Sequence, residues 1–282
     1  MIPAAFDYQR ATTVDDAVRA IGTDGVKVIA GGQSLLPLLK LRLARPDKLV
    51  DIGRIKELRS MRELPDGGYE VGALTTYADL IANTTLDWVR EAVELIGDVQ
   101  VRNRGTVGGS IAHADPASDA PAISLALDYS AVLRSVRGER VVPLDGFFRG
   151  PFQTAMESDE LLVAIRRPPL PTGARGAYRS LEQPASGYSM VGVAAVIATT
   201  GGSISHARVA VTGVGDAPYR AKAVESALAG SDGSAAAIES AAAHATDGVT
   251  VASDIHADAE YRAAMARIYV ARAVEAALAA SA

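Results

Sequence analysis

Residues 100–119 read QVRNRGTVGGSIAHADPASD, a stretch dense in glycine and small polar residues. Its centre, Gly105-Thr106-Val107-Gly108-Gly109-Ser110, lacks bulky side chains where a ligand would approach the backbone. Successive peptide N–H groups in such turns can form an anion-binding concavity. We therefore expect a long loop over 102–116 that could hold a phosphate. Tight turns that need positive φ would also explain the glycines.

A second glycine segment lies upstream. Residues 26–30 are short and rich in β-branched side chains, which predicts a buried strand that ends at Gly31-Gly32. Ser34 then stands where a helix N-cap is expected, before apolar residues at helical spacing from Leu35 to Leu43. A helix N-terminus stabilises a nearby negative charge by ~0.3–1 kcal/mol. Together the two segments are consistent with one phosphate-bearing ligand held from two sides.

The order of the other predicted elements indicates an α+β protein in three parts. Residues 1–55 form a small α/β unit, and residues 56–172 combine antiparallel strands with helices. Residues 168–173, Pro-Pro-Leu-Pro-Thr-Gly, suit a connector to a third part, residues 173–282. Helices are expected over 13–21, 76–81, 87–96, 221–229, 234–245 and 257–280.

Composition excludes several function classes. The 282 residues carry a net charge of −5, which gives no electrostatic case for nucleic acid. Cysteine is absent, so disulfides, thiolate zinc sites and protein-ligated iron–sulfur clusters cannot form on this chain. Neither a signal peptide nor an apolar run of the ~18 residues that span a bilayer is apparent, so we expect a soluble cytoplasmic protein.

Known nucleotide and catalytic motifs are missing. Gly213-Val214-Gly215 lacks the third glycine of the Rossmann fingerprint, because Pro218 occupies that position. Neither a P-loop nor a G-x-S-x-G elbow occurs. His113 and Asp115 have the spacing of two metal ligands without a third nearby, so we predict no metal site. We also predict no catalytic acid or base in this chain.

Both glycine segments resemble the FAD signatures of the medium subunits of the xanthine dehydrogenase and carbon monoxide dehydrogenase family. The first signature covers residues 30–40 and the second covers residues 100–119. Residues 146–148 (Gly-Phe-Phe), residues 159–162 (Asp-Glu-Leu-Leu) and Tyr261-Arg262 also fit, so the resemblance spans essentially the whole chain. It implies a two-lobed FAD-binding domain of the PCMH/vanillyl-alcohol-oxidase type. A C-terminal lobe with a three-stranded antiparallel sheet and a helical bundle would follow.

The resemblance also implies roles for particular residues. Both glycine segments would bind the FAD pyrophosphate, largely through backbone N–H groups. Asp119 would accept hydrogen bonds from sugar or ribityl hydroxyls, although by itself it suits a helix N-cap. Leu162 would contact the cofactor from the end of its strand, or be ordinary core. Tyr188 would lie against the isoalloxazine ring, where stacking adds ~0.5–1.5 kcal/mol. The expected FAD contacts are Val28, Ile29, Ala30, Gly31, Gly32, Gln33, Ser34, Leu35, Thr106, Val107, Gly108, Gly109, Ser110, Asp119, Leu162 and Tyr188.

Two positions depart from the family pattern. Ser180 stands where related subunits often have lysine, so no cation at this position would stabilise reduced flavin. Gln33 stands where the carbon monoxide dehydrogenases typically have histidine, which argues weakly against carbon monoxide as the substrate.

The resemblance implies an electron-transfer subunit of a molybdenum hydroxylase. The molybdenum cofactor would reside on a large partner subunit and the [2Fe–2S] clusters on a small one, and the complex would be a dimer of heterotrimers. FAD would take electrons from the clusters and pass them to an external acceptor. Two alternatives remain open: a self-sufficient flavin oxidoreductase, and a non-catalytic assembly subunit whose glycine segments are plain turns.

Overall fold

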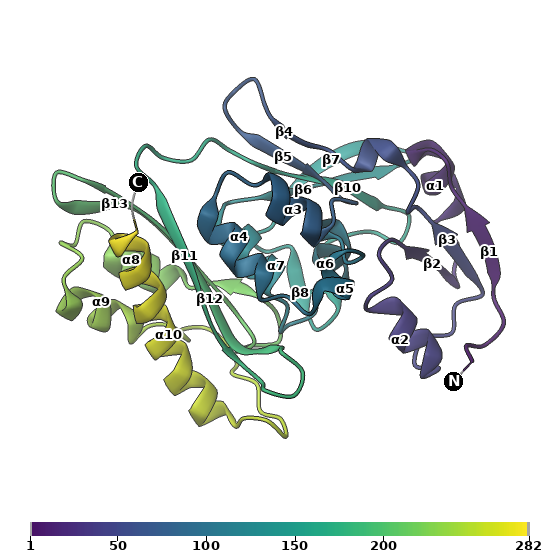
Figure 1. The fold of residues 1–282 in the computed structure, drawn as a ribbon. Coiled ribbons are helices and arrows are strands. Elements are labelled where there is room, and N and C mark those ends of the chain that lie inside the picture. The colour runs from purple at the N-terminus through teal and green to yellow at the C-terminus, as the bar shows by residue number, and fades with distance from the viewer. Residues whose placement is uncertain (1, 281–282) are drawn as a thin grey trace.

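The computed structural model describes residues 2–280 and has three parts in a row (Figure 1). The N-terminal lobe lies at one end, the second lobe in the middle and the C-terminal domain at the other end. The predicted α+β class is confirmed, with two α/β lobes followed by an antiparallel sheet and helices. In the described residues no helix is long and apolar enough to cross a membrane.

The N-terminal lobe is a three-stranded parallel sheet in the order β1-β3-β2. Its first strand was not expected, because Asp7-Tyr8-Gln9-Arg10 is polar and mostly exposed. Pairing with β3, not apolar patterning, holds this strand in the sheet. The expected cap of the first helix is confirmed, since the Thr13 side chain accepts a hydrogen bond from the N–H of Asp16. The elements are β1 (Asp7–Arg10), α1 (Val14–Ala20), β2 (Val26–Ile29), α2 (Leu35–Lys40) and β3 (Lys48–Asp51).

The second lobe packs helices on a five-stranded antiparallel sheet in the order β4-β5-β10-β6-β7. Gly138, with φ +127°, opens β7 directly after the turn that joins it to its antiparallel partner β6. The elements are η1 (Lys56–Leu58), β4 (Met61–Glu63), β5 (Tyr69–Gly72), α3 (Tyr77–Asn83), α4 (Asp87–Glu94), α5 (Val99–Arg102), α6 (Val107–His113), α7 (Asp119–Ala126), β6 (Ser130–Ser135), β7 (Gly138–Pro143), β8 (Phe148–Gly150), β9 (Gln153–Thr154) and β10 (Leu161–Arg167).

The predicted loop over 102–116 is wrong, because most of it is helical. Helix α6 runs through the glycine pair at 108 and 109, although each glycine in a helix interior costs about 1 kcal/mol. Two features offset that cost. The Thr106 side chain caps the helix at the N–H of Gly109, and Gly108 packs against Ala73. Tertiary packing therefore overrides the local preference for a turn.

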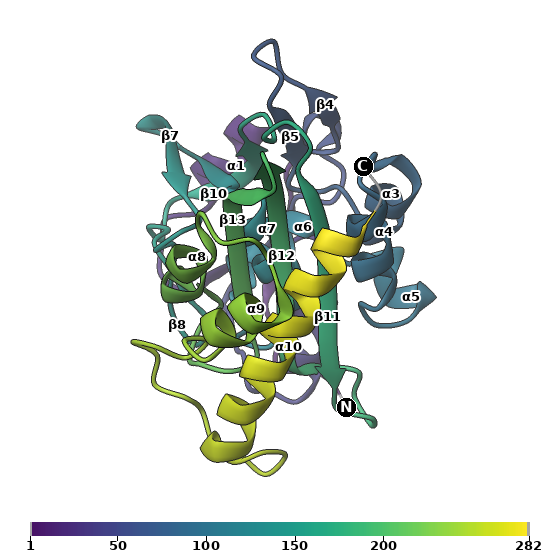
Figure 2. The same cartoon turned by 90° about the vertical axis from the view of Figure 1, so that its left-hand side faces the viewer.

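The C-terminal domain is built on three long antiparallel strands, as predicted, and a two-residue strand β14 extends the sheet. Helix α10 packs on one face of the sheet, beside α9 and α8, and helices α7 and α4 of the second lobe cover the other face (Figure 2). The elements are β11 (Arg175–Glu182), β12 (Ser189–Thr200), β13 (Ser203–Thr212), β14 (Tyr219–Arg220), α8 (Lys222–Leu228), α9 (Ala235–Ala242) and α10 (Ala259–Ala279).

Apolar cores join the three parts. The core of the N-terminal lobe includes Leu74 and Leu161 from the second lobe. The core of the second lobe includes Tyr178, Val196 and Ala210 from the C-terminal sheet. Because apolar burial stabilises by roughly 25 cal/mol per Å², these shared clusters hold the parts against one another and fix the geometry between them.

Candidate functional site

The two glycine segments meet in the structure. A Cβ on Gly31 would overlap the carbonyl oxygen of Arg104 and lie 2.8 Å from its carbonyl carbon. It would also lie 3.1 Å from the Cα of Gly105. A glycine is therefore required at position 31, because the two segments approach each other too closely for a side chain to fit between them. Gly31 and Arg104, which are 73 positions apart in sequence, form one junction between the N-terminal and second lobes.

The first segment is an open turn with unused donors. Gly32 has φ +78°, a conformation that only glycine adopts without strain. Ser34 occupies the predicted N-cap position of α2, but its side chain makes no capping hydrogen bond. Within residues 2–280, the N–H groups of residues 31–35 donate to no acceptor. Consecutive free N–H groups at a helix start are the donor set that binds an anion.

The second segment has already used its donors. The N–H groups of Val107 and Gly108 donate to the carbonyl oxygens of Thr75 and Ala73, each at 3.0 Å. The N–H of Gly109 donates to the Thr106 hydroxyl at 3.2 Å, and that of Ser110 bonds to the Thr106 carbonyl. This segment presents the small surface of Gly109 and the hydroxyl of Ser110, which are half-exposed. It therefore offers no free N–H group over 107–110.

A buried polar cluster follows the second segment. The Ser110 and Ser118 hydroxyls bond to each other at 2.7 Å, and the phenol of Tyr77 is a further neighbour of Ser110. Asp119 is 8% exposed, and its Oδ1 accepts from the Tyr178 hydroxyl and from Ser189 Oγ. Within residues 2–280 its Oδ2 makes no hydrogen bond, so one acceptor oxygen remains for a ligand.

The interpretation of Asp119 as a helix N-cap is wrong. Ser118 holds the N-cap position of α7, and Asp119 is the first residue of the helix, with its side chain turned to the C-terminal sheet. Burial raises the pKa of Asp119, and it also raises the pKa of Tyr77 to about 12. A carboxyl held by two hydroxyl donors is set up to bind a further hydroxyl, which fits the acceptor role expected from the resemblance.

Tyr188 and Leu162 lie in different surroundings. The Tyr188 side chain is 52% exposed, in the turn between β11 and β12 that contains Gly187 at φ +71°. Burial, together with the charges of Asp115 and Asp119, raises the pKa of Tyr188. Leu162 is 3% exposed in the core of the second lobe, which favours the packing role over contact with a cofactor.

A polar cavity of about 310 Å³ lies beside the junction of the two segments. Of the sixteen expected contact residues, Ala30, Gly31 and Thr106 line it, and the rest lie elsewhere. Its lining is Arg10, Ala30, Gly31, Asp51, Gly53, Arg54, Arg59, Leu74, Thr76, Asn103, Arg104 and Thr106.

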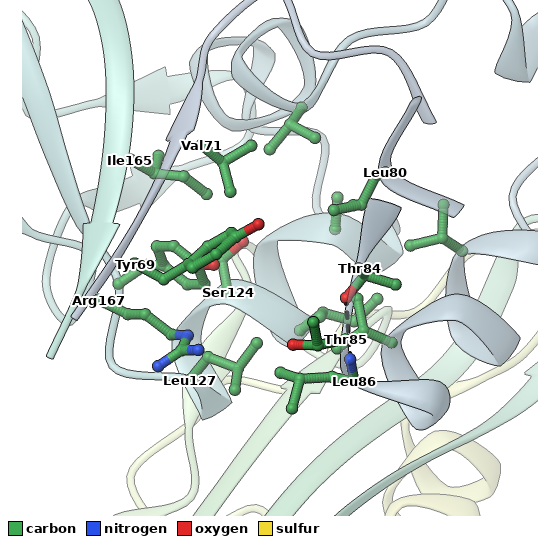
Figure 3. Close-up of a pocket in the computed structure, with 16 residues that line it drawn as sticks. Tyr69, Val71, Leu80, Thr84, Thr85, Leu86, Ser124, Leu127, Ile165 and Arg167 are labelled. Carbon is green, nitrogen blue, oxygen red and sulfur yellow. Dashed lines mark hydrogen bonds between the residues drawn. The ribbon is translucent and has the colours of Figure 1, made fainter. Parts of the chain in front are cut away.

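An apolar cavity inside the second lobe is much smaller, at about 40 Å³ (Figure 3). Tyr69 and Arg167 lie on one side of it and Thr84 and Thr85 on the other, and the Arg167 guanidinium stacks over the Tyr69 ring at 5.4 Å. A cavity that binds benzene has about 150 Å³. The apolar cavity is therefore a packing gap and too small for a flavin.

Several residues of the site escaped the sequence analysis. Tyr77, Tyr178 and Ser189 surround the carboxyl and hydroxyl cluster, yet each reads as an ordinary helix or strand residue. Arg102 lies in the second glycine-rich stretch, but its guanidinium donates to the carbonyl oxygens of Glu94, Ile96 and Gly97 at the end of α4. The arginines of the polar cavity come from three separate stretches of chain, so no local pattern groups them.

The two lobes meet at a glycine turn with free N–H groups, and the second lobe also carries a buried carboxyl. These features define a protein that binds a ligand with phosphate and hydroxyl groups. Residues 4–170 match the family described as FAD binding domain in molybdopterin dehydrogenase. Residues 176–277 match the CO dehydrogenase flavoprotein C-terminal domain. The chain belongs to the family of FAD-binding, medium subunits of the molybdenum hydroxylases.

Relatives match over nearly their full length. The carbon monoxide dehydrogenase medium chain of Hydrogenophaga pseudoflava is 41% identical over 98% of both chains. The 6-hydroxypseudooxynicotine dehydrogenase complex subunit alpha of Paenarthrobacter nicotinovorans is 38% identical, over 99% of this chain and 96% of that one. A solved carbon monoxide dehydrogenase of Hydrogenophaga pseudoflava, which lacks the Mo-pyranopterin moiety of its cofactor, is similar with a TM-score of 0.95 and 42% identity over 99% of both chains. Quinoline 2-oxidoreductase from Pseudomonas putida 86 has a TM-score of 0.90 and 30% identity, with 98% of both chains covered.

Proposed function

We propose that this chain is the electron-transfer flavoprotein subunit of a molybdenum hydroxylase complex. It holds FAD, takes electrons from [2Fe–2S] clusters on a small partner subunit and passes them to an external acceptor. The chain has no cysteine to ligate a cluster, so the clusters must lie on another subunit. Its relatives are named as the medium chains or subunits of larger dehydrogenases, which supports this division of work.

The free N–H groups of residues 31–35 carry the proposal for the cofactor. They would bind the pyrophosphate of FAD, because charge-assisted bonds to a phosphate contribute ~1.5–3 kcal/mol each. The surface of Gly109 would face the same group from the second lobe, and the Ser110–Ser118 pair would supply one hydroxyl donor. The second segment would therefore bind through small surfaces and a hydroxyl, with the backbone donors coming from the first.

The remaining expected contacts would hold the flavin end. Asp119 Oδ2 would accept a hydrogen bond from a ribityl or ribose hydroxyl, while Tyr178 and Ser189 hold Oδ1 in place. The half-exposed ring of Tyr188 would lie against the isoalloxazine. When bound, FAD supplies the redox chemistry, and the protein supplies binding, orientation and electrostatics.

The charge around the flavin would differ from that in relatives that have lysine at the position of Ser180. Ser180 Oγ donates to Glu182 Oε1 at 3.3 Å, so the position of Ser180 carries a hydroxyl bonded to a carboxylate and no cation. A nearby cation stabilises a reduced, anionic flavin by charge proximity. We therefore expect Ser180→Lys to raise the reduction potential of the bound flavin, measured by redox titration.

The first experiment is an absorbance spectrum of the purified chain after mixing with excess FAD and desalting. We expect the two visible bands of oxidised flavin, and Tyr188→Ala should shift these bands and the reduction potential. A folded, colourless chain that stays colourless when expressed with its neighbouring subunits would refute FAD binding and favour an assembly role. Turnover of an organic substrate by the isolated flavoprotein would instead support the self-sufficient oxidoreductase.

Assembly is the second part of the proposal. We expect the chain to co-purify with a large molybdenum-cofactor subunit and a small iron–sulfur subunit, as a dimer of heterotrimers in the cytoplasm. Size-exclusion chromatography with light scattering, together with metal analysis of the complex, measures this directly. A complex that contains flavin but no molybdenum would contradict the assignment.

A further inference from the structure

A buried arginine lies where helix α10 begins, at the end of the C-terminal sheet where β12 starts and β13 ends (Figure 1). This residue, Arg262, is 4% exposed. Its Nη1 donates to the carbonyl oxygen of Met190 at 2.8 Å and to that of Gly213 at 2.6 Å. Its Nη2 donates to Asp254 Oδ2 at 2.7 Å. One guanidinium therefore ties the ends of two neighbouring strands to the loop that precedes α10.

The two strand ends meet closely at Gly213. This glycine has φ +79°, and a Cβ on it would lie 2.7 Å from the carbonyl oxygen of Met190. A planar guanidinium fork suits two adjacent acceptors better than a lysine ammonium group does. Within residues 2–280 the Nε of Arg262 has no hydrogen-bond partner, and burial of an unpaired donor costs free energy. The effect of Arg262 should therefore be sought in the geometry that it holds.

The same strand ends hold the chain that leads into α7. The N–H of Gly213 donates to the carbonyl oxygen of Pro116 at 2.8 Å. The Thr212 hydroxyl is fully buried and donates to the carbonyl oxygens of Pro116 and Ser118, at 2.7 and 2.9 Å. The segment between α6 and α7 is therefore anchored on the C-terminal domain.

Asp119 is placed by these contacts. It directly follows the anchored segment, and its Oδ1 accepts a hydrogen bond from Ser189 Oγ at 2.6 Å. Ser189 directly precedes Met190, whose carbonyl group accepts from Arg262. A shift of either strand end would therefore move the carboxyl group of Asp119.

We propose that Arg262 is a positioning residue for the flavin site, an inference that rests on the proposed function because Asp119 is the expected acceptor for a hydroxyl of FAD. Arg262 holds the ends of β12 and β13 so that Asp119 Oδ2 stays in place for the cofactor. It acts across the sheet, since α10 and α7 pack on opposite faces (Figure 2). A displacement of about 1 Å can cost up to ~100-fold in function, so a residue that never touches FAD can set its affinity.

The test measures the FAD affinity of full-length variants by fluorescence titration. The chain is used alone or, where the native chain alone takes up no flavin, as the complex with its partner subunits. Arg262→Met should weaken FAD binding roughly tenfold, the effect of one lost hydrogen bond to the cofactor. Arg262→Lys keeps a charged donor and should restore part of the affinity. Native affinity in Arg262→Met would overturn the inference.

Arg175 provides the matched control at the opposite end of the same sheet, where it pairs with Ile197. Its Nη1 donates to the carbonyl oxygens of Leu278 and Ala280 at the end of α10, at 3.1 and 2.8 Å. Arg175→Met thus removes a contact of the same kind between the sheet and α10, and it should leave FAD affinity near the native value. Equal weakening by Arg175→Met and Arg262→Met would overturn the inference, because any loosening of the domain would then suffice.

A double-mutant cycle shows whether Arg262 acts through Asp119. Asp119→Asn alone should weaken FAD binding, and the addition of Arg262→Met should then cause little further loss. A residue that only supports the fold would give losses that multiply, to about a hundredfold in total. Multiplying losses would contradict the positioning role.

Hydrogen exchange of the FAD-free chain gives a readout that does not depend on the cofactor. Arg262→Met should speed exchange of the Gly213 amide, because its bond to Pro116 is no longer held in place. Unchanged exchange would mean that the strand ends keep their positions without Arg262, against the inference. If the native chain binds FAD and Arg262→Met binds it equally well, only the positioning role fails. If the native chain binds no FAD even with its partners, the proposed function fails and the positioning role fails with it.

Discussion

The two glycine segments resemble each other in sequence but differ in structure. The segment at 30–34 is an open turn in which Gly32 supplies a positive φ and the N–H groups of residues 31–35 are free. The segment at 105–110 is the capped start of α6, where Gly108 packs on Ala73 and the N–H groups are bonded within the chain. Glycine therefore leaves backbone donors free in one segment and serves the packing of the fold in the other.

The largest effect should come from Gly108→Val. Its Cβ would lie 2.6 Å from the Cα of Ala73 and 2.8 Å from its carbonyl oxygen, and the backbone there cannot yield. We expect a loss of about 3 kcal/mol in the free energy of unfolding, measured by urea denaturation of the FAD-free chain. Ala112→Val, on the exposed face of the same helix, is the control. An unchanged unfolding midpoint with loss of FAD would mean that Gly108 is reserved for the ligand.

Gly31→Ala should reduce FAD binding more strongly than it reduces the stability of the fold. The new methyl group would push the first segment away from Arg104 and open the junction of the lobes. We expect most bound FAD to be lost on desalting, with a stability loss of about 1–3 kcal/mol. Gly150→Ala is the matched control, since its Cβ would approach no atom closer than 3.9 Å. Full retention of FAD would show that the two segments need not touch.

Asp119, the first residue of α7, should make the stability of the chain depend on pH. Burial raises the pKa of Asp119 above the 3.8 of a free side chain. The protonated Asp119 therefore contributes its full stability below pH 3.8, and this contribution is lost as the pH rises through the pKa of the folded state. In the FAD-free chain, Asp119→Asn should therefore gain stability relative to the native chain as pH rises above about 4. Urea denaturation over a pH series measures this. A difference that stays constant with pH would contradict the raised pKa.

The smallest effects concern the two helix starts. Thr106→Ala removes a capping bond and should cost about 1 kcal/mol. Ser34→Ala removes none, and should change the free energy of unfolding by less than about 0.5 kcal/mol. Thermal unfolding of both variants makes the comparison. Equal losses would show that the Ser34 hydroxyl stabilises α2 in solution.

Prediction from sequence succeeded where local patterns dominate. Residues 26–29 form the expected strand, Thr13 caps the expected helix, and the long helix near the C-terminus lies within two residues of its predicted bounds. These elements have strong apolar periodicity or a clear cap. Strand β1 was missed because its polar residues show no such pattern, and its partner strand lies 41 positions away.

The sequence alone determined the class of fold and the family, and it marked the two glycine segments that we propose contact FAD, because glycines, caps and apolar periodicity are local signals. Only the tertiary structure decided which segment keeps free N–H groups, which hydroxyls hold Asp119 and which arginines share one cavity. Those facts depend on contacts between residues far apart in the chain. The packing of Gly31 on Arg104 and of Gly108 on Ala73 fixes them, and a local pattern carries no record of such contacts.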